Sequence, residues 1–399
     1  MAEEYVIIRG RRARSRGSRR GPVLVPSGAH LQAPESLGVD VVQGRQAAAQ
    51  ARKDLDFKAG APSMPMKLIA PVSRNAVASA PPAAALATKI AWGVRAVGAD
   101  TSPFDGSGVI VAVLDTGIDK SHPAFKGVEL VQKDFTGDGN GDVDGHGTHC
   151  AGTIFGRDVD GMRIGVARGA TKALIGKVIG KKGGSSAQIA SAIQWAIENK
   201  ANVVSMSLGI DFPGYQAQLQ GGGLNAEPAT SLALEGYRLN LQVFDSVADL
   251  VSALAQFYQP CLLIAAAGNE SGRDDTPPFE IAASPPAVSE GFVSVAALQE
   301  GKQGLAVASF SNTGANISGP GVGIISAKAG GGLVSMDGTS MATPHVAGVA
   351  ALWAQKLKGT NLFSSKQFSA QLLASAETTS LNSAYTLEAV GSGIVRAPQ

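Results

Sequence analysis

The stretch GVIVAVLD at residues 108–115 is a continuous apolar run that ends in a single aspartate. Such a run, bounded by a glycine and a charged residue, indicates a strand that is buried on both faces of a sheet. Stretches with helical patterning lie between this run and others like it. The alternation predicts an α/β fold with a doubly wound, mostly parallel sheet and helices on both faces. The other strand-like runs are ALIGKVIG (173–180), NVVSMSLG (202–209) and CLLIAAAGN (261–269), and the helical stretches are 186–200 and 243–258.

Composition and charge exclude several other classes of protein. The 399 residues are 44% hydrophobic and 17% charged, which suits one large globular domain or two smaller ones. A net charge of +2 gives no reason to expect nucleic-acid binding, and no apolar run is long enough to span a membrane. The first apolar run is too short for a secretory signal, so we expect a cytoplasmic protein. Two cysteines, Cys150 and Cys261, leave open one disulfide or two reduced thiols.

Residues 1–87 are organised differently from residues 88–399. Seven arginines fall within residues 9–20, which is typical of a solvated arm or of a docking or processing segment. Residues 70–87 are rich in alanine and proline and are predicted to be a linker. Between these segments, YVIIRG, a helix over 45–57 and MPMKLIAPV predict a small strand–helix–strand unit.

Asp115 stands at the end of the first buried strand, where the active groups of a doubly wound sheet gather. Its local sequence, VLDTGID, also occurs around the catalytic aspartates of aspartic proteases. Those enzymes need two carboxylates that share a proton, and this chain has one DTG. An ordinary turn or cap residue is the remaining interpretation.

His146 lies in DGHGTHCAGTI, close to His149 and Cys150, so a zinc site must be considered. Zinc-binding helices favour His-x-x-x-His and zinc ribbons favour Cys-x-x-Cys, and the spacing here matches neither pattern. The glycines on both sides of His146 indicate that the backbone lies close to another group.

Two further residues have both a structural and a catalytic interpretation. Asn269 follows a buried strand, where it is either a turn residue or a side-chain amide aimed at an oxyanion. Ser340 opens GTSMATPHVAGVAAL (338–352), where it is either a helix cap or a nucleophile at a helix N-terminus.

The blocks around these four residues resemble the subtilisin family (subtilases) of serine proteases. The matching blocks occur in the family's order, from about Trp92 to the closing GSGIVRA. They are LDTGID, HGTHCAGT, SMSLG, AAAGNES, ASFSNTG and GTSMATPHVAGVAAL.

The resemblance implies a serine endopeptidase that hydrolyses protein or peptide substrates without a cofactor for the chemistry. Ser340 would be the nucleophile, His146 the general base and Asp115 the group that orients the histidine. Asn269 and the backbone N–H of Ser340 would form the oxyanion hole. An extended peptide would lie between two substrate-binding strands, which the resemblance assigns to Ser207, Leu208 and Gly209 on one side and to Gly183 and Gly184 on the other.

Some segments extend or depart from the family pattern. Cys150 marks the proteinase K-like and thermitase-like branches, where the cysteine is a buried thiol. The acidic run 134–145 resembles a family calcium loop, with Asp138, Asn140, Asp142 and Asp144 as ligands, although a solvated loop is the alternative. Residues 210–260 contain an insertion without a family counterpart. This insertion shapes specificity, binds a partner or has no functional role. By this resemblance, residues 1–87 have the length of an inhibitory propeptide, a small α/β unit whose final strand, here MKLIAPV, would lead into the cleft, so the chain would be a zymogen.

Three functions therefore remain open at this point. The enzyme would either turn over proteins generally or cleave one dedicated partner, and the arginine-rich arm and the insertion favour a dedicated regulatory partner. The third option is a non-catalytic binding protein on a subtilase fold.

Overall fold

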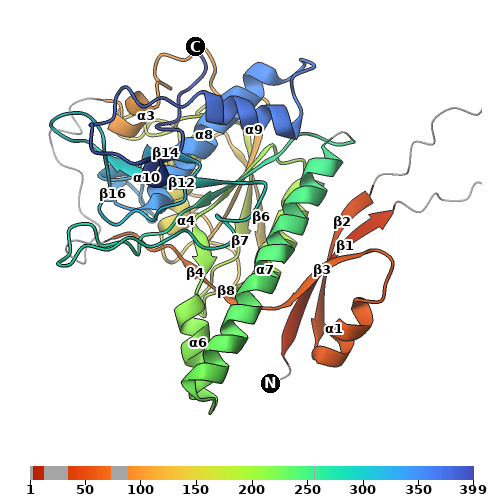
Figure 1. The fold of residues 1–399 in the computed structure, drawn as a ribbon. Helices are drawn as coiled ribbons and strands as arrows, with labels where there is room; N and C mark the ends of the chain where they lie inside the picture. Colours follow the sequence, from red (N-terminus) through yellow and green to blue (C-terminus); the bar gives the residue numbers. More distant parts are fainter. Residues whose placement is uncertain (1–2, 13–34, 73–88, 256) are drawn as a thin grey trace, which may run out of the picture.

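The computed structural model describes residues 3–12, 35–72, 89–255 and 257–399 (Figure 1). Most of the arginine-rich arm and most of the 70–87 linker lie outside these residues. Within the described part of the chain, no helix combines the length and apolar character needed to cross a membrane.

The core is a sheet with strand order β13-β12-β11-β9-β5-β7-β6, and β14 also pairs with β12. Every pairing is parallel except that of β12 with β13. The four apolar runs of the sequence supply β5, β7, β9 and β11, so the predicted doubly wound α/β fold is confirmed. The strands are β5 (Ile110–Asp115), β6 (Glu129–Asp134), β7 (Lys172–Lys177), β9 (Val203–Met206), β11 (Leu262–Ala266), β12 (Phe292–Gln299), β13 (Ala306–Val307) and β14 (Ile317–Pro320).

Helices cover both faces of this sheet because successive strand residues point to opposite sides. Val111 and Val113 of β5 join the core formed with α4 (His146–Phe155) and α8 (Thr339–Leu357). Ala112 and Leu114 join the opposite core, formed with α5 (Ser186–Glu198) and α7 (Ala226–Leu254).

Shorter elements complete the domain. A hairpin of β15 and β16 lies beside α4, and a separate three-stranded sheet has the order β10-β4-β8. The elements are α3 (Trp92–Ala96), the 3-10 turn η1 (Pro123–Phe125), β4 (Pro65–Leu68), β8 (Gly184–Ser185), β10 (Leu208–Ile210), β15 (Ile324–Ala327), β16 (Leu333–Met336), α9 (Ser365–Ala374) and α10 (Leu387–Val390).

The N-terminal unit is a three-stranded antiparallel sheet with one helix. Its elements are β1 (Glu4–Arg12), β2 (Glu35–Gln43), α1 (Arg45–Ala51) and β3 (Phe57–Pro62), with strand order β2-β1-β3. Val6 and Ile8 of β1 pack into the core of α5 and α7, whereas Tyr5 and Ile7 pack towards α1.

This unit corrects the predicted strand–helix–strand order in three ways. The sequence reading missed β2 and β3, and the helix expected over 45–57 ends at Ala51. Turn hydrogen bonds follow at once, from Lys53 N to Gln50 O and from Asp54 N to Ala51 O, so the chain reverses into β3. The segment MKLIAPV does not join the N-terminal sheet, because its strand β4 pairs with β10 and β8.

The insertion at 210–260 is helical. It contains α6 (Phe212–Gly221), whose N-terminus is capped by the Asp211 side chain, and the whole of the long α7. The helix expected over 243–258 thus begins well before its predicted start. In Figure 1, α7 runs alongside the N-terminal sheet and α6 lies next to the N-terminal half of α7.

Candidate active site

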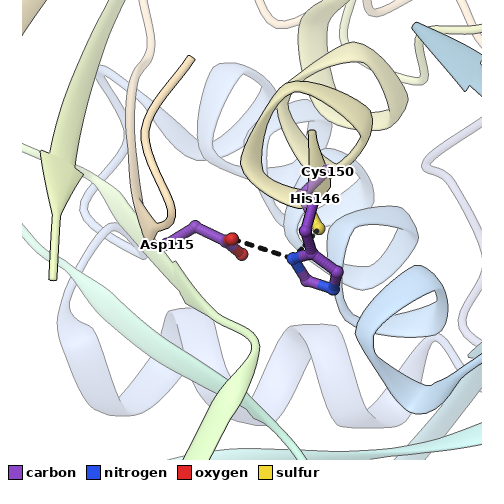
Figure 2. Close-up of side chains that lie close together, drawn as sticks. All are labelled: Asp115, His146 and Cys150. Carbon is purple, nitrogen blue, oxygen red and sulfur yellow. Dashed lines mark hydrogen bonds and ion pairs between the residues drawn. The ribbon is translucent and has the colours of Figure 1, made fainter. Parts of the chain in front are cut away.

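Asp115 and His146 meet at the carboxyl edge of the sheet. Asp115 ends β5, His146 begins α4, and Asp115 Oδ1 lies 2.8 Å from His146 Nδ1 (Figure 2). Both side chains are almost completely buried. The glycine after His146 permits this approach, because a Cβ on Gly147 would lie 2.2 Å from the carbonyl oxygen of Gly117.

The carboxylate sets the protonation of this histidine. Burial by itself lowers the pKa of His146, but the negative charge and hydrogen bond of Asp115, together with the neighbouring Cys150, outweigh it. The pKa of His146 is therefore raised well above its usual value. Its Nε2 is buried and has no hydrogen-bond partner among the described residues, so this nitrogen is available to a group that enters the site.

Cys150 lies beneath His146 as a buried thiol. Its Sγ is 3.7 Å from His146 Nδ1 and donates to the carbonyl oxygen of Ser340 at 3.4 Å. Burial raises the pKa of this thiol, which makes it a poor nucleophile. His149, the other residue of the zinc alternative, points elsewhere, with its Nε2 2.9 Å from Ile324 O. Cys261 is also a free buried cysteine, so the disulfide alternative is wrong.

Pro344 explains how the backbone of Ser340 is held in contact with the Cys150 thiol. The proline lies inside α8 rather than in its first turn, so it offers no N–H to the carbonyl four residues earlier, which is that of Ser340. This carbonyl instead accepts hydrogen bonds from the Cys150 thiol and, at 3.3 Å, from the Ser207 hydroxyl. The sequence blocks that contain Cys150, Ser207 and Ser340 thus meet at one backbone oxygen.

The nucleophile candidate Ser340 and the amide of Asn269 both contact the chain's own N-terminal segment. Ser340 Oγ donates to the carbonyl oxygen of Ile69 at 2.5 Å. Asn269 Nδ2 donates to the carbonyl oxygen of Ala70 at 2.9 Å, while its Oδ1 accepts from Thr339 N at 2.8 Å. Ser340 therefore contacts the carbonyl of the Ile69–Ala70 peptide bond, and Asn269 contacts the carbonyl of the next one, Ala70–Pro71.

Residues 65–69 occupy the place that was predicted for a substrate. Strand β4 pairs antiparallel with β10, where Lys67 faces Gly209 and Leu68 faces Leu208. The register continues with a hydrogen bond from Ile69 N to Ser207 O at 3.1 Å. On the other side Met66 faces Gly184, and a Cβ on Gly183 would lie 3.3 Å from the Met66 carbonyl oxygen. The sequence led us to expect that the strand in MKLIAPV enters the cleft, but not that Ile69 and Ala70 are the residues that reach Ser340 and Asn269.

The proposed calcium ligands do not form a common site. Among the described residues, the one group of three or more histidine, cysteine or acidic donors within ligand reach of each other is Asp115, His146 and Cys150. Asp142 accepts four hydrogen bonds, which use the lone pairs of both its oxygens. Asp138 accepts instead from the backbone N–H of Lys181. The arrangement therefore does not fit calcium binding by Asp138, Asn140, Asp142 and Asp144.

Asp142 instead links the segments that carry Asp115 and His146, a role that the sequence reading missed. Its Oδ1 accepts from the Thr116 hydroxyl, next to Asp115, and from Gly145 N, next to His146. Its Oδ2 accepts from the backbone and hydroxyl of Thr148 in α4. The alternation of acidic residues was therefore a signal for loop packing around the catalytic pair.

Two other histidines of this region are buried in the neutral form. Burial lowers the pKa of His149 to about 3 and that of His345 to about 4. In the unfolded chain a histidine titrates near pH 6.5, so the unfolded state takes up these protons first as the pH falls. Their stabilising contribution is present above pH 6.5 and is lost below it.

We therefore expect the Ser340→Ala chain to lose about 2 kcal/mol per buried histidine between pH 6.5 and 5, at ~1.4 kcal/mol per pH unit. Urea unfolding followed by circular dichroism at both pH values measures this loss. His146, whose pKa is raised, contributes a small change of opposite sign in this range. A free energy of unfolding that is equal at the two pH values would contradict the neutral assignment.

Comparisons with known proteins agree with this geometry. The model of the subtilase family matches residues 106–393. The intracellular serine protease of Paenibacillus polymyxa is 35% identical over 254 residues, which are 62% of this chain and 67% of that protein. The thermostable alkaline protease of Halalkalibacterium halodurans is 35% identical over 272 residues, and the chain spans 62% of that protein's length.

A solved structure shows the same fold. Fervidolysin from Fervidobacterium pennivorans, described as a keratinolytic enzyme related to subtilisin, superimposes with a TM-score of 0.64. The match covers 99% of this chain and 60% of fervidolysin, at 22% sequence identity. Because the family model covers most of the chain, the chain belongs to the subtilase family of serine proteases.

Proposed function

We propose that the chain is a serine endopeptidase. Ser340 Oγ attacks the carbonyl carbon of a peptide bond while its proton passes to His146 Nε2, and the imidazolium gives that proton to the leaving amine. Water then attacks the acyl-enzyme and passes a proton to His146, which gives it to the serine oxygen as the carboxylic acid product leaves. Asp115 fixes the imidazole and stabilises its charged form.

One observation carries this proposal. A peptide segment already lies extended in the cleft, with its carbonyl oxygen at Ile69 2.5 Å from Ser340 Oγ. The Asn269 amide reaches the next carbonyl, which puts an oxyanion donor within a residue of the bond to be cut. No metal or cofactor is needed for this chemistry.

Residues 1–69 are the inhibitory part of this zymogen in our proposal. Strand β4 fills the substrate position, and the Ser340 hydroxyl is engaged by Ile69 instead of by His146 Nε2. The Ile69–Ala70 bond is the one that we expect the enzyme to cut first. The linker of the predicted 1–87 segment would then stay at the new N-terminus, and residues from 88 onward form the peptidase domain.

We propose that the enzyme acts inside the cell on protein substrates. The support is its similarity to two proteins that are named as intracellular serine proteases, from Paenibacillus polymyxa and from Bacillus subtilis. Proteins named as alkaline proteases are similarly related. A dedicated regulatory partner remains a hypothesis that rests on the insertion and the arginine-rich arm.

The test is to incubate the purified chain with a diverse peptide library and to map the cut bonds by mass spectrometry, with Ser340→Ala alongside. Cuts that are absent from the variant would establish a serine endopeptidase and give its side-chain preference. Equal patterns from both proteins would reject the proposal. A wild type that loses residues 1–69 and still makes no cuts would favour the non-catalytic or single-substrate alternatives.

A further inference from the structure

Lys67 of β4 lies between two carboxylates of the peptidase domain. Its Nζ is 3.3 Å from Glu270 Oε1 and 3.7 Å from Asp211 Oδ1. Asp211 belongs to the insertion at 210–260, whereas Glu270 comes directly after Asn269. Across the part of the chain that the structure describes, Lys67 is the one cation that forms an ion pair with either carboxylate. We call Asp211 and Glu270 the acidic pair.

The register of β4 makes Lys67 the third residue before the bond that we expect to be cut. Lys67 faces Gly209 in β10, and Ile69, which directly precedes that bond, donates its backbone N–H to Ser207 O. Alternate side chains of an extended strand point to the same side, so Lys67 shares a side with Ile69, while Met66 is turned into the core. A substrate in this register would bring its own third side chain to the acidic pair.

An apolar cleft of about 490 Å³ adjoins the acidic pair, and Lys67 and Glu270 both line it. Apolar side chains of its wall are Phe212, Leu234, Tyr237 and Ile281. Phe212 and Tyr237 make a T-shaped ring contact with centroids 6.0 Å apart, which fixes the part of the wall that the insertion supplies. Apolar walls beside two carboxylates suit a side chain with a long alkyl stem and a cationic end, as lysine and arginine have.

Both carboxylates are held in place by hydrogen bonds within the peptidase domain. Asp211 Oδ1 accepts from Gly214 N at 3.2 Å, so this side chain caps α6. Glu270 Oε2 accepts from Asn312 Nδ2 at 2.8 Å and from Asn269 N at 2.9 Å, which leaves Oε1 for a cation. The acidic pair is therefore positioned before a substrate arrives, and binding requires little further ordering of these side chains.

We propose that the acidic pair is a specificity-determining subsite that selects lysine or arginine at the third position before the cut bond. This inference rests on the proposed function, because it assigns a side-chain preference to the same endopeptidase. Two carboxylates attract a shared cation, whereas a neutral side chain leaves both without a counter-ion and an acidic one adds repulsion. Both carboxylates are partly exposed, so the contact provides selectivity rather than tight binding, and salt weakens it.

The subsite is tested with quenched-fluorescent peptides that copy residues 65–72, PMKLIAPV. Three further peptides carry arginine, glutamine or glutamate in place of the lysine, and mass spectrometry checks that each is cut after isoleucine. With the wild type we expect kcat/KM to be about fivefold higher for lysine or arginine than for glutamine, as two partly exposed ion pairs can provide, and lowest for glutamate. The difference should lie in KM, because the contact is remote from the reacting carbonyl, and should shrink in about 1 M salt.

The double variant Asp211→Asn/Glu270→Gln removes both charges and keeps the size of the side chains. Asparagine caps a helix as well as aspartate does, so α6 should be retained. In this variant the kcat/KM ratio of the lysine and glutamine peptides should fall to about one. Glu280→Gln is the matched control, because its carboxylate pairs with Arg273 instead, and its ratio should stay near fivefold. Equal kcat/KM for the two peptides in the wild type, or an unchanged ratio in the double variant, would overturn the subsite and leave the endopeptidase in place.

A second measurement needs no catalysis, so it separates a failure of the subsite from a failure of the proposed function. In the intact Ser340→Ala chain, Lys67→Gln should make amide hydrogen exchange in β4 about fivefold faster, whereas Lys67→Arg should keep the parent rate. Exchange in β5 should stay the same in both variants. Peptides that the wild type leaves uncut would count against the proposed function. Exchange in β4 that Lys67→Gln leaves unchanged would overturn the subsite, whatever the enzyme's activity.

Discussion

Ser340→Ala is expected to remain whole at Ile69–Ala70 and to hydrolyse peptides about 10⁶-fold more slowly than the wild type. This is the loss that removal of the nucleophile causes in enzymes with this triad. The reason lies in the contact between Ser340 Oγ and the Ile69 carbonyl, since alanine keeps the backbone but removes the attacking oxygen. Intact-mass spectrometry of the stored proteins should find a new N-terminus at Ala70 in the wild type alone.

The matched control is Ser335→Ala, which makes the same chemical change on β16, in the element just before α8. This variant should be cut like the wild type. Cleavage of Ser340→Ala at the same bond and rate would mean that another protease or another residue does the cutting. A wild-type cut at a different bond would not contradict the assignment of Ser340 as the nucleophile. It would show that β4 is not held in the register of a substrate.

Much of the candidate site was predictable from local sequence because each proposed catalytic group lies at one end of a recognisable element. Asp115 ends an apolar strand, and the carboxyl ends of parallel strands share one edge of the sheet. His146 begins α4 and Ser340 is the second residue of α8, and both helices pack on the same face of the sheet, so three local patterns suffice to bring these groups to one edge. The blocks around them carry the family resemblance, which supplied their proposed roles.

The features that could not be predicted from sequence depend on contacts between segments that are distant in the chain. The pairing of residues 65–69 with β10 and β8 is a tertiary event, and the short apolar run MKLI equally suits a strand of the N-terminal sheet. Gly236 and Asn240 look unfavourable in a helix by propensity alone, and only the positions of Met64 and Pro62 explain them. The acidic loop allowed two interpretations from sequence, because alternate carboxylates suit both calcium and backbone N–H groups.

Asp115→Asn is expected to lower kcat by about 10⁴-fold, the effect of this change in other Ser-His-Asp enzymes. An asparagine keeps the size of the side chain but has no charge to stabilise the imidazolium. Its amide N–H₂ also competes for Nδ1, which favours the wrong tautomer of His146. The effect should fall on kcat rather than on KM, because Asp115 contacts the histidine and not the peptide in the cleft.

Asp115→Asn should also change the pH dependence of kcat/KM. His146 acts as a base only when neutral, and the Asp115 charge raises its pKa, so wild-type kcat/KM should increase through a pH well above 6.5. Without that charge, burial lowers the pKa, and the acidic limb of the Asp115→Asn profile should move to lower pH. Asp119→Asn is the matched control, because its carboxylate accepts from Ser121 and Gly330 instead. A limb that stays in place in Asp115→Asn would mean that this carboxylate does not control the protonation of His146.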